Sequence, residues 1–357
     1  MNGKTFRKSG VVLLGTLLVF GLIAAGVFSW LRSEPEPVTS CEADFRLFEH
    51  AFGVSCVPVD PQNVLSYGPT PGQFMAAIEH PVAMQEEASD VWTSADIPGL
   101  YEHLREVNEG VLDFGRLRGI SGATSLELLL QIQPDLIMSQ YLIDEDLART
   151  ASLVAPAVLL TDEGDWKETT LVAGDVIGEL EEAEALIAAY DERVQILREQ
   201  FDDSSAITVS LVALWPNSAS ILLEDSFSGR IIREVGFSIP EPQLELNTQG
   251  EIINARYMPF SEERLDLIDA DFIFLFPSQT GFDLSDQGYT PKMLAEEFQS
   301  NPIFQLLEAA QSDTVYEAGV HWNVTGIYSA HYVLDDLFRF VAGIDPEEVA
   351  PNPLRLE

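Results

Sequence analysis

Arginine and aromatic residues recur in the loops of this chain, and their chemistry is that of a binding site. Arg116 and Arg118 lie in a glycine-rich loop, where two arginines gain little structurally. Arg230 follows a second loop that contains Phe227 and Gly229. Guanidinium groups donate charged hydrogen bonds to anions, and aromatic rings stack on planar groups. The combination favours a planar, anionic and partly apolar ligand.

The candidate ligand-binding residues lie next to the predicted carboxyl ends of strands, where open α/β sheets bind ligands. They are Tyr67, Arg116, Arg118, Tyr141, Trp166, Trp215, Arg230, Phe276, His321 and Trp322. These residues also have structural interpretations. Trp215 or Trp322 taken alone favours packing in the core or at its rim over ligand contact. Arg230 has Glu234 one helical turn away as an ion-pair partner.

No catalytic constellation is present in the sequence. It has no Gly-x-Gly-x-x-Gly motif, no phosphate-binding loop and no Gly-x-Ser-x-Gly nucleophile turn. The histidines lie far apart and have no metal-ligand spacing; they are His50, His80, His103, His321 and His331. The sequence therefore predicts a protein that is not an enzyme and has no intrinsic cofactor or metal site. A metal-dependent enzyme is a distant alternative.

The charge of the chain argues against one class of partner. Asp and Glu number 58 against 19 Lys and Arg, which gives a formal net charge of −39. Such a surface repels nucleic acid, and the chain has no basic stripe to contact phosphates. The acidity is typical of a solubility or salt-adaptation feature.

The N-terminus has the pattern of an export signal. Lys4, Arg7 and Lys8 precede an apolar run over residues 11–31, so the chain after this run is predicted to be exported. A run of about 20 residues can span a bilayer and is long for a cleaved signal peptide. We expect a periplasmic or otherwise extracytoplasmic protein that is membrane-associated through its N-terminus. Cleavage, acylation and an uncleaved anchor are all compatible with the sequence.

The two cysteines, Cys41 and Cys56, allow two interpretations. Val38-Thr39-Ser40-Cys41 resembles a lipoprotein processing box, which would make Cys41 the lipid site. The polar segment 32–37, however, separates this box from the apolar run. An even number of cysteines in an exported chain is typical of a disulfide. The sequence therefore favours a Cys41–Cys56 disulfide over lipidation.

Short and nearly continuous apolar segments predict parallel strands that are covered on both faces. They lie at residues 63–67, 135–138, 157–160, 209–214, 271–276 and 314–316. Because helical patterns alternate with them, the predicted fold class is α/β. Between the two groups of strands, apolar residues recur every three or four positions from Val172 to Phe201, which predicts one unbroken helix. Its length of about 45 Å favours a strut between two lobes over a crossover within one.

A faint internal repeat relates the two halves. Ser125 opens a predicted helix that leads to Asp135 and a strand, and Ser261 opens another that leads to Asp271 and a strand. The offset from serine to aspartate is the same in both segments, and a glutamate stands two residues after each serine. We therefore expect two related lobes with equivalent elements.

Several segments resemble the iron-siderophore family of periplasmic binding proteins. Residues 49–64, with the cysteines, resemble its N-terminal hairpin. Gln-Pro-Asp-Leu-Ile at 133–137 is similar to its Lys-Pro-Asp-Leu-Ile strand, and Ser-Phe-Ser-Gly at 226–229 to its Ser-Phe-Ala-Gly helix start. Its C-terminal signature is matched at 301–304, 315–316, 328–330 and 333–337. The resemblance covers residues 41–343, with the motifs in the family's order and spacing.

The resemblance implies two Rossmann-like lobes with mainly parallel sheets, joined by one long rigid α-helix. It implies a monomer that captures an iron(III)-siderophore in the cleft between its lobes and delivers it to an ABC permease and its ATPase. In this family a glutamate near a helix start on each lobe engages permease arginines, and Glu127 and Glu263 hold these positions. The siderophore brings its own iron, so the protein needs no metal ligands.

The expected organisation follows from the pattern and the resemblance together. A signal or anchor segment (1–31) and a linker (32–40) precede the N-terminal lobe (41–165). The bridging helix (166–202), the C-terminal lobe (203–343) and a tail (344–357) complete the chain. One alternative is a cobalamin or haem binding protein of the same architecture, in which His321 would be the candidate iron ligand. Another is a membrane-tethered sensor domain that docks no permease.

Overall fold

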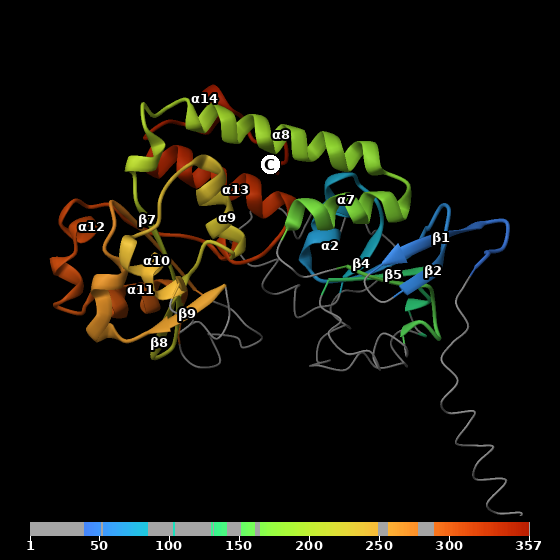
Figure 1. Cartoon of the computed structure of the whole chain (residues 1–357), viewed down its shortest axis with the longest axis horizontal. Coiled ribbons are helices and arrows are strands. Elements are labelled where there is room, and N and C mark those ends of the chain that lie inside the picture. The colour runs from blue at the N-terminus through green and yellow to red at the C-terminus, as the bar shows by residue number, and fades with distance from the viewer. Residues whose placement is uncertain are drawn as a thin grey trace, which may run out of the picture.

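Figure 1 shows a computed structural model in which two α/β lobes lie beneath one long helix, α8 (Leu180–Arg198). The structure describes residues 39–50, 53–84, 103, 130, 132–140, 151–160, 165–248, 256–277 and 289–356. Helix α13 (Ile327–Asp336) runs under α8 and packs against it. The α/β class with mainly parallel sheets, predicted from the sequence, is confirmed.

The N-terminal lobe is built on a parallel sheet with the strand order β4-β3-β5-β6. Its strands are β3 (Val64–Tyr67), β4 (Val82–Met84), β5 (Leu136–Ser139) and β6 (Ala157–Leu159). Every residue of β5 and β6 is buried, as expected for parallel strands with both faces covered. Helix α2 (Pro69–Ala77) starts directly after β3 and packs against α7 (Trp166–Ile177).

The C-terminal lobe is built on a mixed sheet with the strand order β11-β10-β7-β8-β9. Strands β7 (Val209–Trp215), β10 (Phe272–Pro277) and β11 (Val315–Glu317) are parallel. Strands β8 (Ser218–Leu222) and β9 (Tyr257–Phe260) add an antiparallel edge. All six predicted strands are present, whereas β4, β8 and β9 were not predicted.

Helices and single turns complete this lobe and the C-terminal tail. The α-helices are α9 (Phe227–Val235), α10 (Glu241–Thr248), α11 (Pro291–Gln299), α12 (Glu308–Gln311) and α14 (Pro346–Val349). Short 3₁₀ segments lie at Ser204–Ala206, Glu262–Ile268, Phe304–Leu306 and Val320–Trp322, and a π-helical turn (Leu337–Val341) follows α13.

The helical pattern between the lobes is interrupted, so the prediction of one unbroken helix over 166–202 is wrong. Gly178 adopts a φ of 85° and ends α7, and α8 begins at Leu180. A left-handed glycine is a common helix stop. The two helices then pack on each other, and a Cβ on Gly174 would lie only 2.7 Å from the Cβ of Ala183. The bridge between the lobes is therefore α8, whereas α7 packs on α2 in the N-terminal lobe.

Asp135 and Asp271 make equivalent hydrogen bonds in the two lobes. Asp135 accepts hydrogen bonds from the backbone N–H groups of Gln62 (2.7 Å) and Asn63 (3.0 Å), just before β3. Asp271 accepts from the backbone N–H (2.7 Å) and hydroxyl (2.8 Å) of Thr208, just before β7. Each aspartate thus joins the start of one strand to the start of its neighbour. This equivalence supports the predicted repeat, although Ser125 lies outside the described residues.

We expect Asp271→Ala to lower the free energy of unfolding by about 1–3 kcal/mol, because it leaves donors of Thr208 without their acceptor. Urea denaturation followed by circular dichroism measures the change. Asp266→Ala is the matched control, since Asp266 is exposed and pairs with the nearby, exposed Arg264. Equal losses in the two variants would contradict a special role for Asp271.

An N-terminal hairpin precedes the first lobe. Strands β1 (Phe45–His50) and β2 (Gly53–Pro58) pair antiparallel, and Ser55 Oγ donates to the carbonyl of Ala157 in β6 (3.1 Å). Cys41 and Cys56 form a disulfide, so the structure has the pairing that the sequence favoured over lipidation. Within the described ranges, no helix is long and apolar enough to cross a bilayer; residues 1–31 lie outside them.

Candidate ligand-binding site

The carboxyl ends of the parallel strands carry several of the predicted site residues. In the N-terminal lobe, Tyr67 ends β3 and lies beside Ser139, the last residue of β5. In the C-terminal lobe, Trp215 ends β7, and Phe276 stands one residue before the end of β10. The structure thus places these three predicted residues at the carboxyl edges of the two sheets, the edge at which open α/β sheets bind ligands.

A polar junction connects the lobes beside these edges. Thr70 Oγ1 donates to Thr325 Oγ1 (3.1 Å), and Gln140 Nε2 donates to the same oxygen (3.3 Å), while Thr70 N–H donates to Gln140 Oε1 (3.1 Å). One turn further along α2, the amide of Gln73 exchanges two hydrogen bonds with the hydroxyl and backbone N–H of Ser329 in α13 (2.9 and 3.1 Å). Because buried polar groups need partners, this junction holds α2 against α13 in one register.

These junction residues are not among the site residues predicted from the sequence. The one sequence feature that points to them is a polar residue within an otherwise apolar helix. Gln73 in α2 is such a residue, and it is 1% exposed. Periodicity alone does not reveal which distant polar group will be its partner.

Three predicted ligand contacts are core residues. Trp166 is 2% exposed, and its ring meets Tyr190 edge-on with centroids 5.0 Å apart. Trp322 has no exposed surface and stacks on Phe274 with centroids 4.3 Å apart. Phe276 is likewise fully buried. Core packing therefore replaces ligand contact for these three, because an aromatic ring at a strand or helix end can bury itself inward as well as face a cleft.

His321 is held by a carboxylate and is almost buried. Its Nε2 lies 2.8 Å from Asp336 Oδ2, and Trp322 Nε1 donates to the same oxygen at 2.8 Å. Its Nδ1 is buried and has no hydrogen-bond partner in the described part of the chain. The ring thus belongs to the wall of the lobe and presents neither nitrogen to a ligand in this structure.

Arg230 and Trp215 are partly exposed to solvent, so, unlike the three core aromatics, they remain candidates for ligand contact. Both are half-buried. Arg230 lies in the first turns of α9, and its Nε donates to the carbonyl of Asp225 (3.3 Å), which orients the guanidinium group. Glu263 is exposed, just after the helix-capping Ser261, as a docking residue requires.

The other predicted site residues lie outside the described residues. These are Arg116, Arg118, Tyr141 and Glu127, together with the side chain of Tyr67. Over the ranges that the structure does describe, no three His, Cys, Asp or Glu side chains gather closely enough to hold a metal ion.

Residues 118–320, more than half of the chain, match the model of a family described as periplasmic binding protein. The chain belongs to this family. As a periplasmic binding protein it is a substrate-binding protein and not an enzyme.

Named relatives of this periplasmic binding protein match it over most of its length. The probable siderophore-binding lipoprotein YfiY of Bacillus subtilis is 25% identical over 92% of this chain and 97% of its own. The achromobactin-binding periplasmic protein of Dickeya dadantii is 27% identical over 80% of this chain and 87% of its own. The ferric enterobactin-binding periplasmic protein FepB of Escherichia coli is 25% identical over 91% and 96%.

Solved structures share the fold of this periplasmic binding protein. SirA of Staphylococcus aureus, in complex with staphyloferrin B, superposes with a TM-score of 0.68 at 21% identity, over 83% of this chain and 98% of SirA. FeuA of Bacillus subtilis, in complex with ferri-bacillibactin, gives a TM-score of 0.64 at 16% identity, over 84% and 99%. At these identities the likeness concerns the fold alone.

Proposed function

We propose that this protein captures an iron(III)-siderophore between its two lobes and delivers it to the permease of an ABC importer. The observation that carries the proposal is the near-full-length match to relatives named as siderophore-binding proteins, in a chain of the periplasmic binding protein family. Each lobe provides an edge of parallel-strand carboxyl ends, which is where such sheets bind ligands. The iron arrives inside the ligand, so no resident cofactor is needed.

Arg116, Arg118 and Arg230 are the proposed anion-binding residues. On a chain with a net charge of −39, arginines that face a ligand supply a local attraction that the rest of the surface lacks. Trp215 and the tyrosines Tyr67 and Tyr141 are the proposed stacking residues. Guanidinium groups bind the carboxylate or phenolate oxygens of a siderophore through charged hydrogen bonds, and the rings cover its planar parts.

Glu127 and Glu263 are the proposed permease-docking residues, one on each lobe. Each carboxylate would pair with a basic group on the permease, and the acidic surface would add long-range attraction. The exposure of Glu263 is compatible with this role. Anchoring of the N-terminus in or on the membrane would keep the protein close to its permease.

We expect Arg116→Ala/Arg118→Ala to weaken siderophore binding at least tenfold, because two charged hydrogen-bonding groups are lost and each contributes about 1.5–3 kcal/mol. Tryptophan fluorescence quenching of residues 39–357, which keep the Cys41–Cys56 disulfide, by ferric siderophores, haem and cobalamin measures the affinities. Arg264→Ala/Arg355→Ala is the matched control, since both side chains are exposed and pair with neighbouring carboxylates.

The titration also decides between ligand classes. Saturable, submicromolar quenching by one ferric siderophore supports the proposal. Quenching by haem or cobalamin alone would indicate that this compound, and not a siderophore, is the ligand of the two-lobed fold. No response to any of them would reject the proposed ligand class and leave the fold unaffected.

A further inference from the structure

We propose that an ion triad of Lys167, Asp191 and Glu234 is a latch that sets the angle between the lobes. It lies where α7, α8 and α9 meet, which we call the hinge. The effect of this latch on ligand capture, the second part of the inference, rests on the proposed function. Lys167 belongs to α7 of the N-terminal lobe, Asp191 to the bridging helix α8, and Glu234 to α9 of the C-terminal lobe. A single ammonium group therefore connects all three bodies that must move when the lobes rotate.

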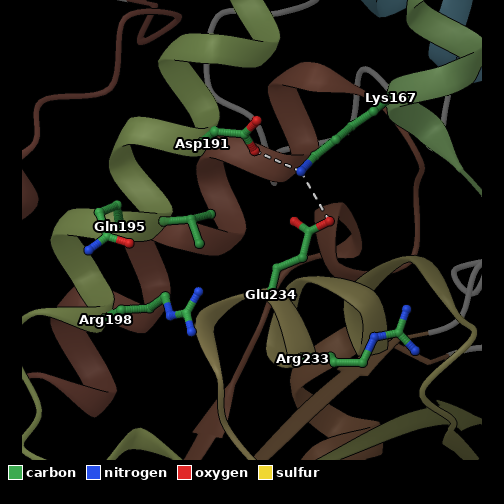
Figure 2. A pocket seen from close by; sticks show the side chains of 7 residues that line it. Lys167, Asp191, Gln195, Arg198, Arg233 and Glu234 are labelled. Carbon is green, nitrogen blue, oxygen red and sulfur yellow. Dashed lines mark hydrogen bonds and ion pairs between the residues drawn. The ribbon is translucent and has the colours of Figure 1, made fainter.

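The contacts of this group are direct. Lys167 Nζ lies 2.8 Å from Asp191 Oδ1 and 3.0 Å from Glu234 Oε1, and Figure 2 shows the lysine reaching between the two carboxylates. The lysine side chain is only 20% exposed. Burial by itself lowers the pKa of Lys167, but the hydrogen bond to Asp191 and the charge of Glu234 outweigh it and raise the pKa overall. The ammonium group is thus held in its charged form by both partners.

Aromatic rings form the floor under the triad. Lys167 Nζ lies 4.7 Å from the ring centroid of Tyr190 and 5.7 Å from that of Trp166, within the range of cation–π attraction. The hydroxyl of the buried Tyr190 donates to Glu234 Oε2 at 2.8 Å. Trp166 also meets Phe227 of α9 edge-on, with centroids 6.5 Å apart. The start of α7 is therefore bound to both ends of α9.

A hollow lies beside the triad, so side-chain packing does not fix α9 against α8 there and the ion pairs restrain their relative position. It has a volume of about 430 Å³ and is lined by Val194, Gln195, Arg198 and Arg233 besides the triad itself. Since side chains do not fill this space, α9 has room to shift against α8 once the ion pairs are broken. A tightly packed interface would instead resist movement through its shape.

The lysines of the chain allow a matched comparison. They are Lys4, Lys8, Lys167 and Lys292. Lys292 is exposed and pairs with Glu296 one turn along the same helix, so its ion pair connects no separate elements. Replacing Lys292 removes one positive charge from the molecule without touching the hinge.

The test measures the distance between the lobes in the ligand-free protein. Spin labels are attached to a ketone-bearing amino acid at positions 153 and 306, so that the native disulfide stays intact. Leu153 (79% exposed) lies in the N-terminal lobe and Leu306 (71% exposed) in the C-terminal lobe. Double electron–electron resonance then gives the distance distribution for wild type, Lys167→Met, Glu234→Gln and Lys292→Met. Methionine keeps the packing on the rings and removes the charge.

We expect Lys167→Met to broaden and shift the distribution, Glu234→Gln to do so less, and Lys292→Met to leave it unchanged. If Lys167→Met fails to fold, as judged by near-ultraviolet circular dichroism, Glu234→Gln carries the test, because it keeps the shape of the side chain. Folded variants with the wild-type distribution would overturn the latch.

Ligand titration separates the latch from the proposed function. If a ferric siderophore binds the wild type, we expect Lys167→Met to weaken binding about three- to tenfold, in proportion to the lost fraction of competent molecules. A changed distance distribution with unchanged affinity would overturn the coupling to capture. If no siderophore binds the wild type, the proposed function fails, while the distances still decide whether the latch exists.

Discussion

Arg193→Ala is expected to lower the free energy of unfolding by about 3–5 kcal/mol, because it leaves the carboxylate of Asp335 buried without its countercharge. Arg193 in α8 is 3% exposed and Asp335 in α13 is 2% exposed, and the two form an ion pair. Arg193 also donates to the carbonyls of His331 (3.0 Å) and Ala350 (2.9 Å). One guanidinium group therefore binds the bridging helix to α13 and to the C-terminal tail.

The neighbouring histidine completes this network. Burial and the charge of Arg193 lower the pKa of His331 to about 3, so its ring is neutral and Nδ1 accepts a hydrogen bond from Arg193 (2.9 Å). Asn352 of the tail donates to the other oxygen of Asp335 (3.1 Å). The guanidinium group of Arg193 satisfies acceptors on Asp335, His331 and Ala350 together. Its removal therefore leaves several buried acceptors without this partner at once.

Urea denaturation of Arg193→Ala, followed by circular dichroism, measures the loss. Arg264→Ala is the matched control and should cost less than about 1 kcal/mol, because that ion pair is exposed. The double replacement Arg193→Met/Asp335→Leu removes both charges and should recover much of the stability. A loss below 1 kcal/mol for Arg193→Ala would mean that water or another cation reaches Asp335.

Gly229→Ala is expected to destabilise the C-terminal lobe by about 1–3 kcal/mol or more, through overpacking against a backbone that cannot yield. A Cβ at this position would lie 2.1 Å from the carbonyl oxygen of Leu223 and 2.9 Å from Cα of Glu224. The same glycine donates its N–H to Ser226 Oγ (3.1 Å), which caps α9. The close approach explains why the Ser-Phe-Ser-Gly segment has glycine in its last place.

Thermal and urea unfolding of Gly229→Ala measure this effect, with Arg233→Ala on an exposed position of the same helix as the control. Alanine has the higher helix propensity, so propensity alone would make Gly229→Ala stabilising by roughly 1 kcal/mol. A stabilised variant would therefore show that the segment 223–224 moves away from the helix at little cost.

The strands and the class of fold could be read from the sequence because they depend on local patterns. Continuous apolar runs gave each of the six predicted strands, since a parallel strand buried on both faces tolerates few polar residues. The matched positions of Asp135 and Asp271 were visible as a repeat, and both carboxylates bind the start of a neighbouring strand. Strand β8, which lies between β7 and β9, was missed because the short Ser-Ala-Ser segment that begins it lacks such a run.

Local patterns were less informative where one residue decides between two geometries. The periodicity from 172 to 201 passes through Gly178 without a gap, yet its left-handed conformation ends α7 and turns the chain back on itself. Aromatic residues at the ends of strands and of short helical segments gave a similar ambiguity. Trp322 packs inward on Phe274, whereas Trp215 keeps part of its surface. Composition and spacing are the same for both outcomes.

What the sequence alone determined was the pattern of an export signal, the α/β class and the two-lobe organisation; it also predicted the edge of each sheet at which a ligand would bind. These follow from hydrophobic periodicity and charge, which act over a few residues at a time. Only the tertiary structure decided which charges meet. Lys167 and Glu234 are 67 residues apart, and Arg193 and Asp335 are 142 apart. Pairing over such separations depends on how the lobes pack around α8, and no local spacing records it.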